Sequence, residues 1–499
     1  MASSDNSDMD RAKAARRTLL LIIIIAIAAA LRLSSLGRQP LWLDEATDAS
    51  FAARPFWDCL FAEHVHPPLY RTLLHFVVLE FGDSAAAVRF LPALFGILTI
   101  PATWLLARRL VPKTELMAAA LVAASPFLVF FSQENRNYSL FILLAVLASW
   151  AFVRFQQERR GLALYCVLAI LLLYTHYLAL LVLLAHEVVY WWHLRYRVFD
   201  WMLNRLAIFV AFLPWVLWME QQYRNESRLF MSVTLLIPMA LLRFLLGFGV
   251  AVFDATRLTE NLWTTVAQET AFLVPSLALF GWLLWRGLWR VSAQREGRIL
   301  FAAILFIPWT VLLLLAPWLQ LASERYLAFQ APFVLLLVAV GLCSLQRLDR
   351  IFASLAVAVV VGFSLFAYYG APGSAFGYRF RFAKENWPEA ASLVRQQRAD
   401  TVIIAPGYLK LALDRYPLGT VRAIPMSADS SVPLDLKGDL KGARRVALVT
   451  ARSGQAEERL RAELDASYPR IAEEVFLSQN SIRVAVYEIA HRPELPAKK

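Results

Sequence analysis

The 499-residue sequence has only three cysteines, and charged residues make up only 18% of it. Cys59, Cys166 and Cys343 are too few and too scattered for a disulfide framework or a cysteine-rich metal cluster. No internal repeat is evident, and residues 370–499 contain no glycine-rich phosphate loop. The sequence therefore gives no sign of a disulfide-stabilised secreted domain, a repeat protein or a nucleotide-phosphate site in that region.

Apolar residues make up 59% of the chain, whereas a soluble globular protein has about 45–50%. They occur in blocks such as 19–31, 300–316 and 326–345, each close to the roughly 20 residues that cross a hydrocarbon core. The sequence therefore predicts an all-α polytopic membrane protein. We attribute the net charge of +12 to basic cytoplasmic loops and expect no nucleic-acid partner.

We predict eleven membrane-spanning helices, at about 18–36, 88–107, 115–131, 138–153, 162–174, 178–193, 206–219, 267–285, 299–316, 326–345 and 351–369. With a cytoplasmic N-terminus, the cytoplasmic segments carry 19 Lys and Arg in 61 residues, and the opposite segments carry nine in 112. This asymmetry supports that orientation. The first apolar run is longer than a typical signal-peptide core, so we expect an uncleaved helix.

Two further apolar stretches, 67–82 and 229–253, fall within the predicted outer segments 37–87 and 220–262. Either one, crossing the membrane singly, would invert every later loop. We therefore predict that both are helices lying at the outer membrane interface.

Residues 1–369 are predicted to form a transmembrane catalytic domain, and residues 370–499 a small extracytoplasmic α/β domain. In the second region 401–406, 445–452 and 481–489 are predicted strands, and 386–397 and 455–464 are predicted helices. We expect this domain to be an accessory module.

Polar groups that gather on one side of the predicted membrane domain are candidates for a functional site, because such groups are costly at membrane level. The first is Asp44 with Glu45, directly after the first helix. One of these carboxylates could act as a general base for a hydroxyl, or the pair could hold a divalent cation such as Mg²⁺ or Mn²⁺. The alternative is that the pair is the start of a solvated loop or a helix N-cap.

Four further polar stretches fall on the same predicted side, and each has a plain structural alternative. His66 precedes two prolines that could simply start a helix, and the stretch containing Glu134, Arg136 and Tyr138 could be a tight turn. His176 could be a buried histidine paired with a hydroxyl. The Arg325-Tyr326 pair could grip a lipid-borne phosphate, or the arginine could reach the interface as a snorkelling side chain. The convergence of these stretches on one side favours a site at the outer interface.

These stretches also resemble a known family. The order LDE, HPPLY, RFLPALFG…ARRL, SPFLVFFSQENRNYSL, YTHY and ERYL, over most of residues 18–345, is similar to the bacterial GT-C glycosyltransferases. The nearest groups are the family 39/83-type membrane transferases, relatives of protein O-mannosyltransferases and lipid A aminoarabinose transferases. The resemblance implies transfer of a sugar from a polyprenyl-phosphate carrier to a lipid, glycan or protein acceptor. It also implies a bacterial inner-membrane location.

The resemblance assigns roles to individual residues. It makes Asp44 the general base with Glu45 as its motif partner, and Glu134 the second acidic residue, where some relatives carry Asp. Arg136 and Tyr138 match the Arg and Tyr of the same loop, while Arg325 and Tyr326 match a pair expected near the lipid phosphate. It assigns residues 370–499 no role.

Two other classes stay open at this point. A polytopic transporter or flippase of lipid-linked glycans would also have many helices, but transporters tend to show repeats and charges near the bilayer midplane. A membrane-tethered scaffold acting through residues 370–499 would leave the polar stretches unexplained.

Overall fold

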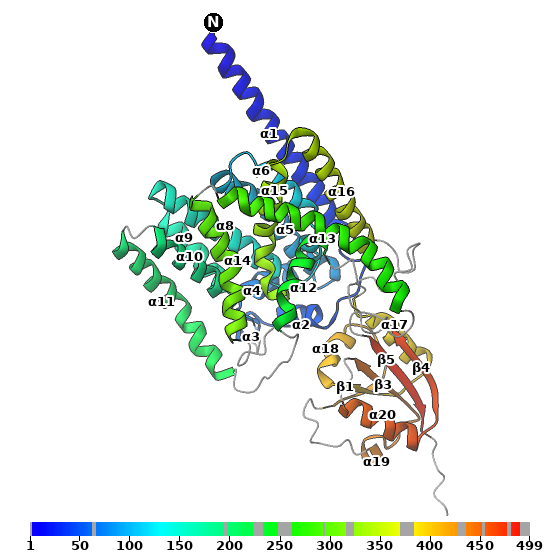
Figure 1. Cartoon of the computed structure of the whole chain (residues 1–499). Coiled ribbons are helices and arrows are strands. Elements are labelled where there is room, and N and C mark those ends of the chain that lie inside the picture. Colours follow the sequence, from blue (N-terminus) through cyan, green and yellow to red (C-terminus); the bar gives the residue numbers. More distant parts are fainter. Residues whose placement is uncertain are drawn as a thin grey trace, which may run out of the picture. The chain divides into compact units, whose positions relative to one another are not determined.

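Helices account for most of the first 369 residues, as the apolar composition predicts (Figure 1). The computed structural model describes residues 2–61, 66–193, 197–222, 233–247, 262–292, 295–315, 324–369, 384–426, 436–451, 455–476 and 481–489. The helices before residue 200 are α1 (Ala2–Leu33), α2 (Leu43–Ala52), α3 (Phe56–Phe61), α4 (Leu69–Phe81), α5 (Ala85–Leu110), α6 (Glu115–Ala124), α7 (Pro126–Ser132), α8 (Tyr138–Glu158), α9 (Leu162–Leu173), α10 (Ala179–His193) and α11 (Val198–Gln222). They are followed by α12 (Val233–Leu246), α13 (Leu262–Ser292), α14 (Arg295–Leu315), the 3₁₀ helix η2 (Glu324–Gln330), α15 (Ala331–Cys343) and α16 (Arg347–Tyr369).

Eight helices in the described part of the chain are long and apolar enough to cross a membrane. They lie at Arg11–Leu33, Ala85–Leu110, Tyr138–Glu158, Val198–Met219, Ala271–Val291, Arg298–Leu315, Arg325–Cys343 and Arg347–Tyr369. Together α6 and α7 make a ninth candidate, while α9 and α10 are apolar but shorter. The expected multi-pass helical architecture is confirmed, and the orientation of the termini stays a prediction.

The bend of 59° between α6 and α7 follows from the local sequence. Pro126, at the start of α7, cannot continue the hydrogen bonding of α6. The Ser125 hydroxyl accepts a hydrogen bond from the Leu128 amide at 3.3 Å and so caps the new helix. Helix α6 therefore ends at this break, and the separate helix α7 leads into the polar loop that begins at Gln133.

The two stretches predicted as interfacial helices contain α4 and α12. Of the second stretch, residues 229–232 and 248–253 lie outside the described residues. The membrane depth of both helices stays a prediction.

Helices α13 and α15 cross at backbone contact distance. A Cβ atom added at Gly287 would lie 2.1 Å from the Leu337 carbonyl oxygen, and one added at Gly341 would lie 2.1 Å from that of Leu283. Small residues at such crossings let transmembrane helices approach closely enough for extensive van der Waals contact. The two glycines are therefore needed on steric grounds.

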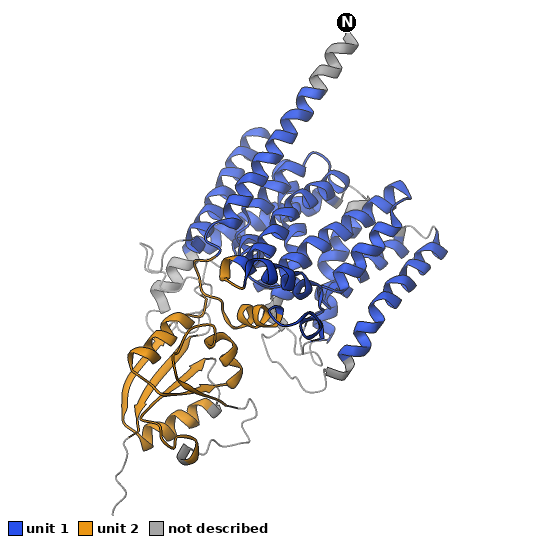
Figure 2. Cartoon of the chain, turned by 180° about the vertical axis from the view of Figure 1, so that it is seen from behind, with its two compact units in different colours: residues 1–36, 52–82, 87–370 blue, residues 37–51, 83–86, 371–499 orange. Residues whose placement is uncertain are grey.

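The chain divides into two compact units (Figure 2). One consists of residues 1–36, 52–82 and 87–370, and we call it the membrane unit. The other consists of residues 37–51, 83–86 and 371–499, and we call it the sheet unit. The segment 37–51, which includes most of α2 and carries Asp44, thus belongs to the same compact unit as the C-terminal α/β fold.

The sheet unit is built on five strands in the order β2-β1-β3-β5-β4. Its elements are α17 (Trp387–Gln396), β1 (Thr401–Ala405), η3 (Gly407–Leu409), α18 (Lys410–Leu413), β2 (Arg422–Pro425), α19 (Leu436–Asp439), β3 (Arg445–Ala451), α20 (Gln455–Ser467), β4 (Arg470–Phe476) and β5 (Ile482–Glu488). The pairings of β1 with β2 and with β3 are parallel, whereas β5 runs antiparallel to β3 and β4.

The predicted small α/β region is confirmed, with two strands that the sequence did not reveal. The buried runs of β1, β3 and β5 are continuous apolar segments. By contrast, β2 is only four residues long and β4 is mostly exposed, so neither shows an apolar pattern.

The α13–α15 crossing yields a stability prediction. Gly287→Ala should lower the stability of the protein by about 1–3 kcal/mol, because the new methyl group overlaps backbone on α15. Gly281→Ala on the same helix meets no atom within 4 Å and is the matched control. Thermal unfolding in detergent, followed by tryptophan fluorescence, checks both variants. Equal midpoints would contradict the close crossing.

Candidate functional site

The loop between α7 and α8 is a buried polar hub of the membrane unit. Its five residues, Gln133, Glu134, Asn135, Arg136 and Asn137, are all less than 9% exposed. A run of polar residues can be buried among apolar helices only when its groups find partners within the protein. The loop is therefore more than the solvated tight turn considered as its alternative.

The side-chain amides of the three Gln and Asn residues in this loop each form hydrogen bonds with a different part of the chain. The side-chain nitrogen of Gln133 lies within 3.1 Å of three backbone carbonyl oxygens near the end of α1. Asn135 accepts a hydrogen bond of 2.7 Å from the Tyr70 hydroxyl of α4. Asn137 donates to the Thr175 carbonyl oxygen at 2.8 Å, in the turn between α9 and α10. The loop thus fixes α1, α4 and that turn around itself.

The HPPLY stretch joins the same hub. The Leu69 amide at the start of α4 donates to the Tyr174 carbonyl oxygen at 3.0 Å. This bond holds His66, which is buried just before the two prolines, against the α9–α10 turn. The ring centres of His66 and His176 lie 5.1 Å apart.

His176 is the centre of an aromatic cluster drawn from separate parts of the chain. Its ring stacks on Phe141 of α8 at 4.7 Å and lies 6.0 Å from the ring of Tyr138. The ring of Tyr326 in η2 lies 5.9 Å away. Tyr138 also lies 6.4 Å from His66. Four predicted site residues thus meet in one cluster, in which three are buried and Tyr326 is partly buried.

Charged groups of the predicted site act electrostatically on two residues of this cluster. Arg136 and Arg325 both act electrostatically on His176 and Tyr138, and Glu134 acts on Tyr138 as well. Burial and the two guanidinium groups lower the pKa of His176 to about 3. His176 is therefore neutral at pH 7.

The hydrogen bonding of His176 fixes its tautomer. Its Nδ1 accepts a hydrogen bond from the Leu178 amide at 3.1 Å, so the proton of the neutral ring resides on Nε2. Among the described residues, this buried Nε2 has no hydrogen-bond partner. The cluster thus presents an N–H donor within electrostatic range of two arginines, a combination suited to an anion.

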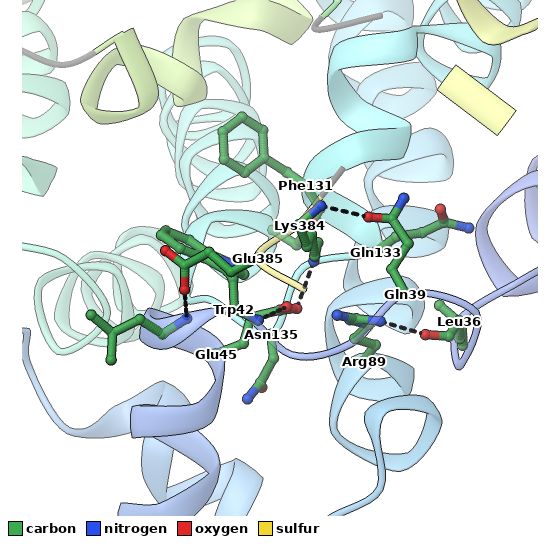
Figure 3. A network of polar contacts seen from close by, with 12 residues as sticks. Leu36, Gln39, Trp42, Glu45, Arg89, Phe131, Gln133, Asn135, Lys384 and Glu385 are labelled. Carbon is green, nitrogen blue, oxygen red and sulfur yellow. Dashed lines mark hydrogen bonds and ion pairs between the residues drawn. The ribbon is translucent and has the colours of Figure 1, made fainter. Parts of the chain in front are cut away.

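Asp44 and Glu45 lie in the first turn of α2, in the sheet unit. Asp44 is partly exposed, whereas Glu45 is fully buried and its Oε1 lies 2.8 Å from Nζ of Lys384 (Figure 3). The meeting of the acidic pair with the histidine cluster stays a prediction.

A cavity of about 360 Å³ lies beside the loop that leads into α2. It is lined by Gly37, Arg38, Gln39, Pro40, Leu41, Ala85, Pro388, Arg415 and Tyr416. Arg415 is paired with Asp83 at 2.9 Å. The cavity therefore lies entirely within the sheet unit.

A divalent cation at the acidic pair stays a prediction as well. The described residues include no group of three or more His, Cys, Asp and Glu placed to hold a metal ion. The Lys384 ammonium group also occupies one oxygen of Glu45.

Several residues of the hub, and two residues that contact the first turn of α2, carry little signal in the sequence. Asn135 and Asn137 stand in the same polar run as Glu134, and their alternation with charged residues was the available signal. Tyr70 was visible only as part of the HPPLY stretch. Lys384 and Glu385 lie in an ordinary polar segment that gives no local sign of a role.

The depressed pKa of His176 yields a prediction about pH. Between pH 7 and pH 5 only the unfolded state takes up a proton on this side chain, since its unfolded pKa is 6.5. The contribution of the neutral His176 side chain to the free energy of unfolding is therefore complete above pH 6.5. It falls by about 2 kcal/mol between pH 7 and pH 5. Between pH 7 and pH 5, the free energy of unfolding of His176→Phe should fall by about 2 kcal/mol less than that of the wild type. Thermal unfolding of both proteins at pH 7 and pH 5 checks this, and an equal pH dependence would contradict it.

Residues 65–218 match the family model described as dolichyl-phosphate-mannose-protein mannosyltransferase. That segment contains His66, Glu134, Arg136, Tyr138 and His176. No curated protein sequence matches the chain.

Solved structures are similar over nearly the whole chain. ArnT from Cupriavidus metallidurans in the apo state is 12% identical, with 94% of this chain and 98% of that chain covered and a TM-score of 0.57. ArnT bound to undecaprenyl phosphate is 13% identical, with 93% and 97% covered and a TM-score of 0.56. The archaeal oligosaccharyltransferase AglB from Archaeoglobus fulgidus, in complex with an inhibitory peptide and a dolichol-phosphate, is 12% identical, with 97% and 75% covered and a TM-score of 0.51. The chain therefore has the GT-C fold, and the predicted resemblance is confirmed in its architecture.

Proposed function

We propose that the protein is a membrane glycosyltransferase that moves a sugar from a polyprenyl-phosphate carrier to an acceptor hydroxyl on the extracytoplasmic side. The observation that carries this proposal is the cluster in which Arg136 and Arg325 both act electrostatically on the buried, neutral His176. Guanidinium groups match phosphate oxygens, and an imidazole N–H adds a further donor. We therefore assign this cluster to the phosphate of the lipid-linked donor.

The comparisons support the class of ligand. The ArnT structure holds undecaprenyl phosphate, and the AglB structure holds a dolichol-phosphate. In this chain the proposed phosphate site lies between apolar helices, so a prenyl chain could lie against them while the sugar faces water. A lipid, a glycan or a protein could supply the acceptor hydroxyl.

The chemistry proposed for the site is a single displacement. Asp44 takes the proton of the acceptor hydroxyl while that oxygen forms a bond to the anomeric carbon. The bond from the anomeric carbon to the phosphate oxygen breaks, and polyprenyl phosphate leaves with its new negative charge. Arg325 and Arg136 stabilise that charge. Attack opposite the leaving phosphate inverts the anomeric centre.

The remaining cluster residues have supporting roles in this proposal. His176 donates from Nε2 to a phosphate oxygen, and His66 with Tyr138 and Tyr326 forms the aromatic wall of the site. Glu134, in the same loop as Arg136, is assigned to the sugar hydroxyl groups.

Removal of the base tests the chemical assignment. Asp44→Asn should lower kcat for sugar transfer by 100-fold or more, since general base catalysis contributes about 10² to 10⁴. The unfolding midpoint in detergent should be unchanged, because Asp44 is partly exposed. Asp58→Asn, an exposed change on α3, is the control. Near-normal transfer by Asp44→Asn in purified protein would remove the base assignment.

Replacement of Arg325 tests whether this residue binds the phosphate of the donor. Arg325→Gln should raise the apparent KM for the polyprenyl-phosphate sugar about 10- to 100-fold, which corresponds to the loss of a charge-assisted hydrogen bond. The apparent KM for the acceptor should change much less. Arg54→Gln, an exposed change between α2 and α3, serves as the control in the same steady-state assay. An unchanged donor KM would contradict the assignment.

A further inference from the structure

The first turn of α2 is held by residues that lie more than 300 positions later in the chain. The Leu43 amide, one of the helix-start donors that lack a partner within their own helix, donates to the Glu385 carboxylate at 2.9 Å. The same oxygen of Glu385 accepts from the indole nitrogen of Trp387 at 2.9 Å. Trp387 is fully buried at the start of α17. Glu385 therefore couples the start of α2 to the core of the sheet unit.

Lys384 makes a second attachment on the same turn. Its Nζ lies 2.8 Å from Oε1 of Glu45, and both side chains are buried, at 7% and 0% exposure. Its backbone amide also donates to the Gln39 side chain at 3.1 Å. Two consecutive residues of the C-terminal region thus hold the loop before α2 and its first turn together (Figure 3).

These contacts give the two carboxylates of the acidic pair different tasks. Glu45 is occupied at Oε1 by Lys384 and lies 3.4 Å from the Trp42 amide through Oε2. A carboxylate engaged at both oxygens and shielded from solvent is poorly placed to take a proton from an acceptor. Asp44, about 100° further round the helix, is partly exposed.

We propose that Lys384 and Glu385 are positioning residues that fix the first turn of α2, Lys384 through Glu45 and Glu385 through the Leu43 amide, so that only Asp44 of the acidic pair is presented to substrate. This inference rests on the transferase function proposed above. It gives the C-terminal region, expected to be an accessory module, a direct part in forming the site. Lys384 and Glu385 themselves touch neither substrate nor the reacting atoms.

The test uses the full-length protein in detergent. Lys384→Met should lower kcat at least 10-fold with less than a twofold change in donor KM, and it should speed hydrogen–deuterium exchange in peptides covering 41–48. Lys384→Arg keeps the ion pair and should stay within threefold of the wild-type kcat. Lys410→Met is the control, because Lys410 pairs with Asp414 on the surface of the same unit.

A double change separates positioning from simple stability. If Lys384→Met does not fold, Glu45→Gln/Lys384→Met removes both buried charges and should restore the unfolding midpoint. The proposal predicts that kcat of this folded double variant stays at least 10-fold low and that exchange in 41–48 stays fast. Recovery of both the midpoint and the wild-type kcat would overturn the proposal.

The failures of the two proposals are distinguishable. Wild-type transfer activity with an equally active Lys384→Met variant overturns the positioning role and leaves the transferase standing. A wild-type protein that transfers no sugar overturns the transferase and the positioning role that rests on it. In that case, faster hydrogen–deuterium exchange of Lys384→Met in peptides covering 41–48 would support only the structural contact between Lys384 and Glu45.

Discussion

Polar groups buried in an apolar helical bundle need partners inside the protein, because lipid supplies none. The loop from Gln133 to Asn137 meets this constraint by alternating amides with charged residues. The amides bond to the end of α1, to α4 and to the α9–α10 turn. Those bonds fix three separate segments around one loop, and Arg136 of this loop acts electrostatically on His176 in the α9–α10 turn. The placement of the candidate site in the membrane unit follows from this hub.

Much of this architecture could be predicted from the sequence because its signals are local. Apolar runs of membrane length gave the helices, and continuous apolar segments gave β1, β3 and β5. The polar stretches containing His66, Glu134, His176 and Arg325 stood out because such residues are costly near lipid. Where the local signal is weak, the prediction was incomplete. Strand β2 is only four residues long, and most residues of β4 are exposed.

The sequence could not reveal contacts between residues far apart in the chain. Lys384 and Glu385 belong to a polar segment like many others, and only the fold places them on the first turn of α2. The adjacent carboxylates of Asp44 and Glu45 looked equivalent for the same reason. An ion pair makes Glu45 a buried anchor, and this distinction depends on a lysine 339 positions away. Which of the two adjacent carboxylates is buried and paired therefore depends on the fold and cannot be seen in the local sequence.

The central claim is that the buried arginine and histidine cluster serves the breaking of a sugar–phosphate bond. Its most direct test is to incubate the purified wild-type protein in lipid nanodiscs with a panel of polyprenyl-phosphate sugars, each with candidate acceptors, and to measure free polyprenyl phosphate. The account predicts release with at least one donor, in equal amount to the sugar that reaches the acceptor and with inverted anomeric configuration. If reconstituted vesicles instead moved the intact lipid-linked sugar between leaflets and no donor released its phosphate, the account would be contradicted.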